Sequence, residues 1–161
     1  MLSIKIRGVL VVHACFSLSR AALAERLNRF DLEVEAWQPL GQYSATSLDL
    51  DLDYQSSMDL VDALSKVAKL RFEIVLWPSE GFTGERWVWS PALGLSSCQI
   101  DAAGNTLIGE AKLSSILRES GDNALKIERL IRQAMLKAWD EEFEDLREQR
   151  ISQRRQLPRV G

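Results

Sequence analysis

Apolar and polar residues alternate along four short stretches of the chain, the pattern of β-strands with one buried face. Two other stretches repeat apolar residues every three or four positions, which is typical of helices that bury one side. In chain order the predicted elements are a strand over residues 4–13, a helix over 20–30, strands over 32–37 and 46–54, a helix over 56–70 and a strand over 71–77. This mixture predicts an α+β protein.

The order β-α-β-β-α-β is that of ferredoxin-like folds, in which two helices cover one face of an antiparallel sheet and strands one and three lie in its centre. We therefore expect a ferredoxin-like core. The opposite sheet face would be half charged and half apolar, with Val9, Val11, Val75 and Trp77 in the apolar half. A bare apolar patch invites association, so we expect the rest of the chain to cover it.

Beyond this core the pattern predicts a β-hairpin and C-terminal helices. The expected elements are strands over residues 85–90 and 95–101 around a turn at 91–94, a helix over 110–119, and one long helix that begins after a cap at 121–123. Glycine and proline favour the turn, and the apolar spacing favours the helices. We expect residues 1–148 to form a single domain.

A basic tail follows over residues 149–161, with Arg150, Arg154, Arg155 and Arg159 and no acidic residue. Such a tail could bind phosphate groups or the acidic helix of a carrier protein. The alternative is that the tail is simply solvated.

Composition excludes several classes of protein. The 161 residues are 46% hydrophobic and 27% charged, with a formal net charge of −3. This is ordinary for a globular protein, and nucleic-acid binding is expected only through the tail. No apolar run approaches the roughly 20 residues that span a bilayer. The first residues carry charges and no small-residue cleavage site, so we expect no signal peptide, a cytoplasmic location, and reduced Cys15 and Cys98.

Familiar catalytic and metal-binding patterns are incomplete in this sequence. One histidine and two distant cysteines cannot complete a four-ligand zinc site. Asp49, Asp51 and Asp53 are spaced like the start of a calcium loop, but Tyr54 stands where that loop needs glycine. The sequence has no phosphate-binding glycine loop and no Gly-x-Ser-x-Gly turn. We expect no metal and no cofactor, and the catalytic residues, if any, stay unknown.

The best site candidates gather in one predicted strand. Arg86 could donate charge-assisted hydrogen bonds to an anionic ligand, beside Glu85, while Trp87 or Trp89 offers a stacking wall. His13, the single histidine, completes this candidate set for ligand or partner binding. The alternative is that a tryptophan belongs to the core and Arg86 pairs with a surface acid.

Two functions are compatible with these residues. The first is a binding or regulatory module for a protein partner or a small anionic ligand. The second is a small enzyme of unknown reaction with its site around His13, Glu85, Arg86 and Asp101. The enzyme hypothesis requires these four side chains to converge in one pocket with shifted pKa values.

A series of short motifs runs through almost the whole chain. They are Arg7-Gly8-Val9, Val12-His13, Trp37-Gln38-Pro39, Leu70-Arg71-Phe72-Glu73, Gly84-Glu85-Arg86, Ser90-Pro91-Ala92-Leu93-Gly94, Asp101 with Gly104-Asn105, Ala138-Trp139-Asp140-Glu141-Glu142 and Arg159-Val160-Gly161. In this order they resemble an uncharacterised actinobacterial family, domain of unknown function 3145. The resemblance implies no activity, cofactor or catalytic residue, because the family has none established. It suggests a link to type II fatty-acid synthesis, beside whose genes its members often sit.

Overall fold

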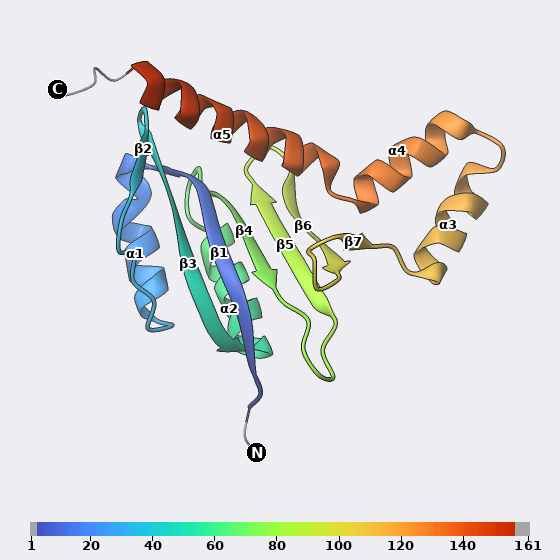
Figure 1. Ribbon diagram of the computed structural model, residues 1–161, viewed down its shortest axis with the longest axis horizontal. Helices are drawn as coiled ribbons and strands as arrows, with labels where there is room; N and C mark the ends of the chain where they lie inside the picture. Colours follow the sequence, from blue (N-terminus) through green and yellow to red (C-terminus); the bar gives the residue numbers. More distant parts are fainter. Residues whose placement is uncertain (1–2, 157–161) are drawn as a thin grey trace.

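The chain folds into one antiparallel sheet with helices on both of its faces, as a computed structural model of residues 3–156 shows (Figure 1). The elements are β1 (Lys5–Phe16), a short 3-10 helix (Ser17–Ser19), α1 (Arg20–Asn28), β2 (Gln38–Leu40), β3 (Tyr43–Asp53), α2 (Tyr54–Ser65), β4 (Arg71–Leu76), β5 (Gly84–Ser90), β6 (Gly94–Ile100), β7 (Thr106–Leu107), α3 (Glu110–Ser120), α4 (Ala124–Ala134) and α5 (Lys137–Gln156). The strand order is β2-β3-β1-β4-β5-β6-β7. The predicted α+β class is confirmed.

The main core lies between the sheet and α1 and α2, which cover one face together (Figure 1). Alternating residues of the strands, such as Leu10 and Ile74, are fully buried against Leu23 of α1 and Leu60 of α2. In each of these strands, every second side chain therefore faces the core. Among the first four strands of the chain, β1 and β3 are the two central ones, with β2 and β4 on either side, as expected. The relation to ferredoxin-like folds stays a prediction.

The second predicted strand is wrong. Residues 32–37 pair with no strand, although Leu32 and Val34 are partly buried against the core. The strand lies further along, where Pro39 of β2 pairs with Ser44 of β3. Proline is tolerated there because β2 is an edge strand, whose outward N–H needs no partner. Apolar alternation in residues 32–37 reflects packing of an extended segment.

The helix boundaries also differ from the predicted ones, and α2 ends at Ser65 instead of residue 70. α2 starts at Tyr54, before the expected cap, because the Asp53 carboxylate accepts a hydrogen bond of 2.7 Å from the Ser56 N–H. The expected long C-terminal helix is divided into α4 and α5 at Leu136, whose φ is +58°. Leu136 is buried in a second apolar cluster with Val88, and this packing outweighs the cost of a left-handed backbone.

The second apolar cluster lies on the open face of the sheet, where α5 crosses from β5 to β2 (Figure 1). Trp139 and Phe143 of α5 are buried there against Val88. The expected cover is therefore present at one end of this face. The four apolar residues named above keep some exposure, with Val9, Val11 and Val75 half-buried and Trp77 38% exposed. A single crossing helix is too narrow to cover the whole face.

The C-terminal region is helical as far as the structure describes it. α5 runs through residue 148 to Gln156, so residues 149–156 of the expected basic tail continue this helix, and residues 157–161 lie outside the described residues. The division into a domain over 1–148 and a separate tail stays a prediction. Within residues 3–156, no helix has the length and apolar character needed to cross a membrane.

Candidate functional site

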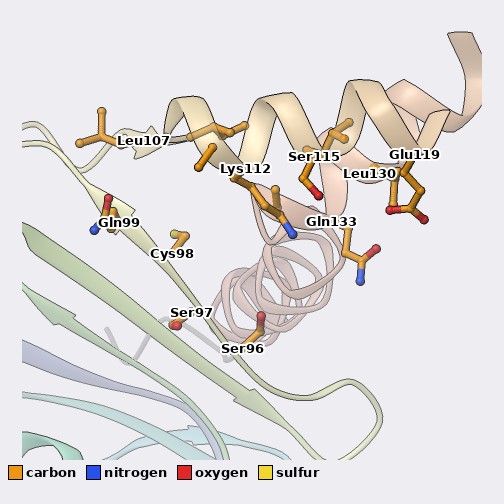
Figure 2. Close-up of a pocket in the computed structure, with 15 residues that line it drawn as sticks. Ser96, Ser97, Cys98, Gln99, Leu107, Lys112, Ser115, Glu119, Leu130 and Gln133 are labelled. Carbon is orange, nitrogen blue, oxygen red and sulfur yellow. The ribbon is translucent and has the colours of Figure 1, made fainter. Parts of the chain in front are cut away.

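A groove with a volume of about 690 Å³ lies between β6 and the helices α3 and α4 (Figure 2). Its floor is residues 96–99 of β6, and the chain from Leu107 to Gly109 closes one end. Helix α3 forms one wall and the last turns of α4 contribute to the other side. The groove therefore joins a strand edge to a helix pair.

The edge of β6 is open along most of the groove. β6 pairs with β5 over its whole length, whereas β7 pairs only with Gln99 and Ile100. Within the described part of the chain, residues 95–98 thus have no strand on their outer side. In an antiparallel strand, about half of the backbone N–H and C=O groups point to each side. Residues 95–98 therefore present backbone donors and acceptors to the groove.

The short β7 follows from the turn that precedes it. The Asp101 carboxylate accepts hydrogen bonds of 2.9 Å from the N–H groups of Ala103 and Asn105. Gly104 has a φ of +83°, a conformation that glycine adopts without steric cost. This tight turn returns the chain beside Ile100 for two residues only, after which it leaves the sheet to form α3.

Helices α3 and α4 form an arm that extends to the side of the sheet (Figure 1). They pack on each other, with Ile116 of α3 buried, and Asn123 caps α4 by accepting a hydrogen bond from the Lys126 N–H. No residue of α4 is fully buried, although Ile127 and Ile131 are half-buried at helical spacing. The arm contacts mainly itself and α5.

The groove is lined by a mixture of polar side chains, such as Ser96 and Gln99 of β6, and apolar side chains, such as Leu130 of α4. Figure 2 shows Lys112 reaching from α3 toward the space above β6. Among the described residues Lys112 has no ion pair, whereas Glu119 pairs with Lys126 at 3.9 Å. In residues 3–156, no group of three or more His, Cys, Asp or Glu side chains is arranged to hold a metal ion. The groove offers one positive charge and many hydrogen-bonding groups.

Cys98 lies on the floor of the groove, with its sulfur 3.8 Å from the Thr106 hydroxyl oxygen. Burial raises the pKa of this thiol, and the Thr106 hydrogen bond and the positive charge of Arg86 offset that effect only in part. The side chain is therefore a thiol and not a thiolate at neutral pH. Both cysteines are free, as predicted.

Two of the predicted site residues, His13 and Arg86, lie under α5, and Arg86 of β5 is the cross-strand neighbour of Cys98 on the groove floor. Glu73 joins them, because His13 Nε2 is 3.2 Å from Glu73 Oε1 and Arg86 Nε is 2.6 Å from Glu73 Oε2. Arg86 Nη1 reaches Asp140 of α5 at 2.8 Å. The Arg86 side chain is only 16% exposed, and two carboxylates of its own chain hold it. Arg86 is rigidly placed, but its partners are intramolecular.

The charges around Glu73 determine how it titrates. Burial alone would raise the pKa of Glu73, but the hydrogen bond from His13 and the positive charge of Arg86 outweigh it and lower the pKa to about 2. A carboxylate only accepts hydrogen bonds, so His13 Nε2 carries the shared hydrogen. Glu73 thus stays ionised across the physiological range and links β1, β4 and β5.

A second set of polar contacts fixes α5 beside this network. Glu142 accepts hydrogen bonds from Arg71 Nε at 2.7 Å and from the Ser90 hydroxyl at 2.6 Å. The Trp139 indole N–H donates to the Gly94 carbonyl over 3.1 Å. The motif at residues 139–142 therefore attaches α5 to β4, β5 and the first residue of β6.

The other predicted site residues face away from α5. Trp87 and Trp89 pack against the main core, on the sheet side opposite Arg86, as their strand spacing predicted. The Glu85 carboxylate accepts hydrogen bonds from the Trp87 indole at 2.9 Å and the Tyr54 hydroxyl at 3.1 Å. Asp101 lies in the turn before β7, so the four side chains of the enzyme hypothesis do not gather at one point.

Sequence reasoning missed the groove residues. Ser96 and Ser97 belong to no recognisable sequence motif. Lys112 and Ser115 lie more than ten residues further along the chain, on a helix, and nothing in the sequence relates them to Ser96 and Ser97. The available signal was indirect, namely a polar strand followed by a strand too short to cover it. Only the folded chain brings residues 96–99 and 112–133 together.

Comparison with known proteins places the chain by family alone. The family model described as "Protein of unknown function (DUF3145)" matches residues 17–154. No curated protein and no solved structure matches the chain. The resemblance expected from the sequence motifs is confirmed, and any function must come from the site itself.

Proposed function

The chain belongs to the DUF3145 family of proteins of unknown function, and we propose that it is a protein-binding module that takes an extended partner segment into the groove between β6 and the α3–α4 arm. The single observation that carries this proposal is the unpaired outer edge of residues 95–98 in front of a cavity of about 690 Å³. An added strand would complete the hydrogen bonding of this edge.

The surroundings of the edge favour one extended segment. Natural proteins protect exposed strand edges with charges, bulges or covering elements. Here the covering element is the α3–α4 arm, which stands off from β6 and leaves the cavity between them. Four residues of strand extend over roughly 13 Å. The groove therefore suits a short extended segment. The α3–α4 arm hinders the pairing of this edge with the edge of a second whole sheet.

The side chains in the groove indicate the chemistry of the partner. Backbone hydrogen bonds give affinity in strand addition, and flanking side chains give selectivity. Lys112 has no acidic partner among residues 3–156, so an acidic side chain of the bound segment would pair with it. Leu130 offers an apolar contact on the other side. We expect selected segments to combine one acidic residue with small or apolar neighbours.

The other hypotheses have less support. The enzyme alternative requires a shared pocket. His13 and Arg86 meet at Glu73 under α5, but Glu85 faces the other side of the sheet and Asp101 lies in a turn. A ligand role for the set Glu85, Arg86, Trp87, Trp89 and His13 stays a prediction, since a ligand of Arg86 would have to displace Glu73 or Asp140. A cytoplasmic location and a link to type II fatty-acid synthesis also stay predictions.

A selection from a random peptide library tests the proposed function. Peptides enriched on the wild-type protein should bind Ser115→Trp at least about tenfold more weakly, because the indole would fill the cavity beside β6. Ser114→Trp is the matched control, since Ser114 is an exposed residue of the same helix that does not line the groove. Fluorescence anisotropy would compare the three affinities. Peptides that bind all three proteins equally would contradict the proposal.

The two cysteines provide an independent measurement of peptide position. A peptide in the groove should slow iodoacetamide alkylation of Cys98, whose thiol lines the floor. Cys15 is the internal control, because it is buried and burial raises its pKa to about 11, so it should stay unreactive in both conditions. Mass spectrometry after short exposures would measure both rates. An unchanged Cys98 rate at saturating peptide would place the peptide elsewhere.

A further inference from the structure

Three arginines surround a small cavity at the far end of α5, next to β2. Arg147, Arg150 and Arg154 line a volume of about 150 Å³ together with Gln38 and Ile151. Spacings of three and four residues place the arginines on one side of the helix. Gln38 belongs to β2, which lies at the end of α5 away from α3 and α4 (Figure 1).

Contacts with β2 hold the central arginine of the cluster. Arg150 Nη1 donates a hydrogen bond of 3.2 Å to the Gln38 side-chain oxygen, and α5 contacts β2 along this region. Arg150 is half-buried as a result. A guanidinium has five N–H donors, so this single bond leaves most of the donors of Arg150 available to a ligand.

The charges of the cluster are only partly neutralised. Arg147 pairs with Glu144 at 2.8 Å, but within the described chain neither Arg150 nor Arg154 forms an ion pair. Glu35 lines a neighbouring cavity with Arg150 and does not pair with it. Burial, together with the positive charges of Arg147 and Arg154, lowers the pKa of Arg150. The cluster therefore has an excess of positive charge, which a bound anion would relieve.

We infer that this cavity is an anion site that binds one phosphate group. Arginine forms paired, charge-assisted hydrogen bonds with phosphate oxygens, and three guanidiniums can surround a doubly charged group. The cavity of about 150 Å³ leaves room for a small anion between the three arginine side chains. A second cavity of about 440 Å³, which shares Gln38 and Arg150, gives room for the rest of a phosphate monoester.

Titration calorimetry with inorganic phosphate, at constant ionic strength, tests the inference. Arg150→Gln and Arg154→Gln should each weaken phosphate binding at least about tenfold, because each removes a charge-assisted donor. Arg155→Gln is the matched control, since Arg155 carries the same charge on the same helix but does not line the cavity. If Arg155→Gln weakens phosphate binding as much as Arg154→Gln does, the binding is general charge attraction and the proposed site is wrong. A wild-type protein that binds neither inorganic phosphate nor the phosphate-bearing vesicles described below would also overturn it.

A second experiment, with lipid vesicles, distinguishes the two possible sources of the phosphate group. Vesicles of phosphatidic acid in phosphatidylcholine offer a lipid phosphate monoester, and pure phosphatidylcholine vesicles are the control. Phosphate binding without vesicle binding supports a soluble ligand. A lipid ligand is supported if the protein binds the phosphatidic acid vesicles, if Arg150→Gln and Arg154→Gln abolish this binding, and if Arg155→Gln preserves it. Circular dichroism would establish that each variant keeps its fold, and Arg154→Gln alone suffices if Arg150→Gln unfolds.

Discussion

Phe143→Ala should lower the free energy of unfolding by about 3 to 5 kcal/mol, the usual cost of emptying a buried phenylalanine site. Phe143 is 2% exposed and stacks on His13, with ring centroids 4.0 Å apart. It is one of four buried residues in the second apolar cluster. Because this cluster is small, the loss of the ring cannot be compensated by neighbouring residues, and chemical denaturation would measure the change.

The matched control for Phe143→Ala lies on the same helix. Ile151 is 45% exposed, so Ile151→Ala should change the free energy of unfolding by no more than about 1 kcal/mol. Hydrogen exchange would show where the first variant opens, since α5 should lose protection before the main core does. A Phe143→Ala protein as stable as the wild type would mean that α5 does not pack on the sheet in solution.

Glu73→Gln should lower the free energy of unfolding by about 3 kcal/mol near neutral pH. The pKa of Glu73 falls from its ordinary value of 4.5 to about 2 in the folded protein, which corresponds to about 3 kcal/mol of stabilisation of the ionised form. The amide keeps the shape but removes the charge, so Arg86 retains only Asp140 as an acidic partner. Replacing one member of a largely buried charge network is costly because the others stay buried.

The pH dependence of stability gives the sign of this contribution. Since the folded pKa lies below the unfolded value, the stabilisation is fully present above about pH 4.5 and is lost as the pH falls toward about 2. The difference between the wild type and Glu73→Gln should therefore shrink over that range. Glu80→Gln is the control for net charge, because Glu80 is exposed. A difference that stays constant down to pH 2 would rule out an ionised Glu73 as its source.

These two predictions concern the same structural relation, the attachment of α5 to the sheet. The chain passes through the α3–α4 arm before it reaches α5, so the arm is held at β7 on one side and at α5 on the other. Loosening α5 should therefore widen or disorder the groove at β6. Peptide binding to Phe143→Ala should be weaker than to the wild type even though Phe143 does not line the groove.

The sequence by itself determined the elements with strong local periodicity. Alternation in β1, β3 and β4 predicted both their existence and the residues that face α1 and α2. Strand spacing alone placed Trp87 and Trp89 opposite Arg86. These predictions succeed because side-chain direction in a strand or helix depends only on neighbouring residues and the backbone repeat.

Local pattern failed where distant packing decides the backbone. Residues 32–37 alternate without joining the sheet, since a strand also needs a partner edge that the sequence does not name. The break between α4 and α5 depends on burying Leu136 beside Val88, a residue far away along the chain. Helical periodicity continues through that point, so only the tertiary contact could reveal the break.

The candidate sites were decided almost wholly by tertiary structure. The sequence identified Arg86 and the basic character of residues 149–156, because charge and residue type are local properties. It could not identify Glu73 and Asp140 as the partners of Arg86, since ion pairs between distant residues depend on how the helix crosses the sheet. For the same reason the open edge of β6, the arm above it and the cavity that three arginines share with Gln38 exist only in the folded chain, where strand order and helix packing bring them together.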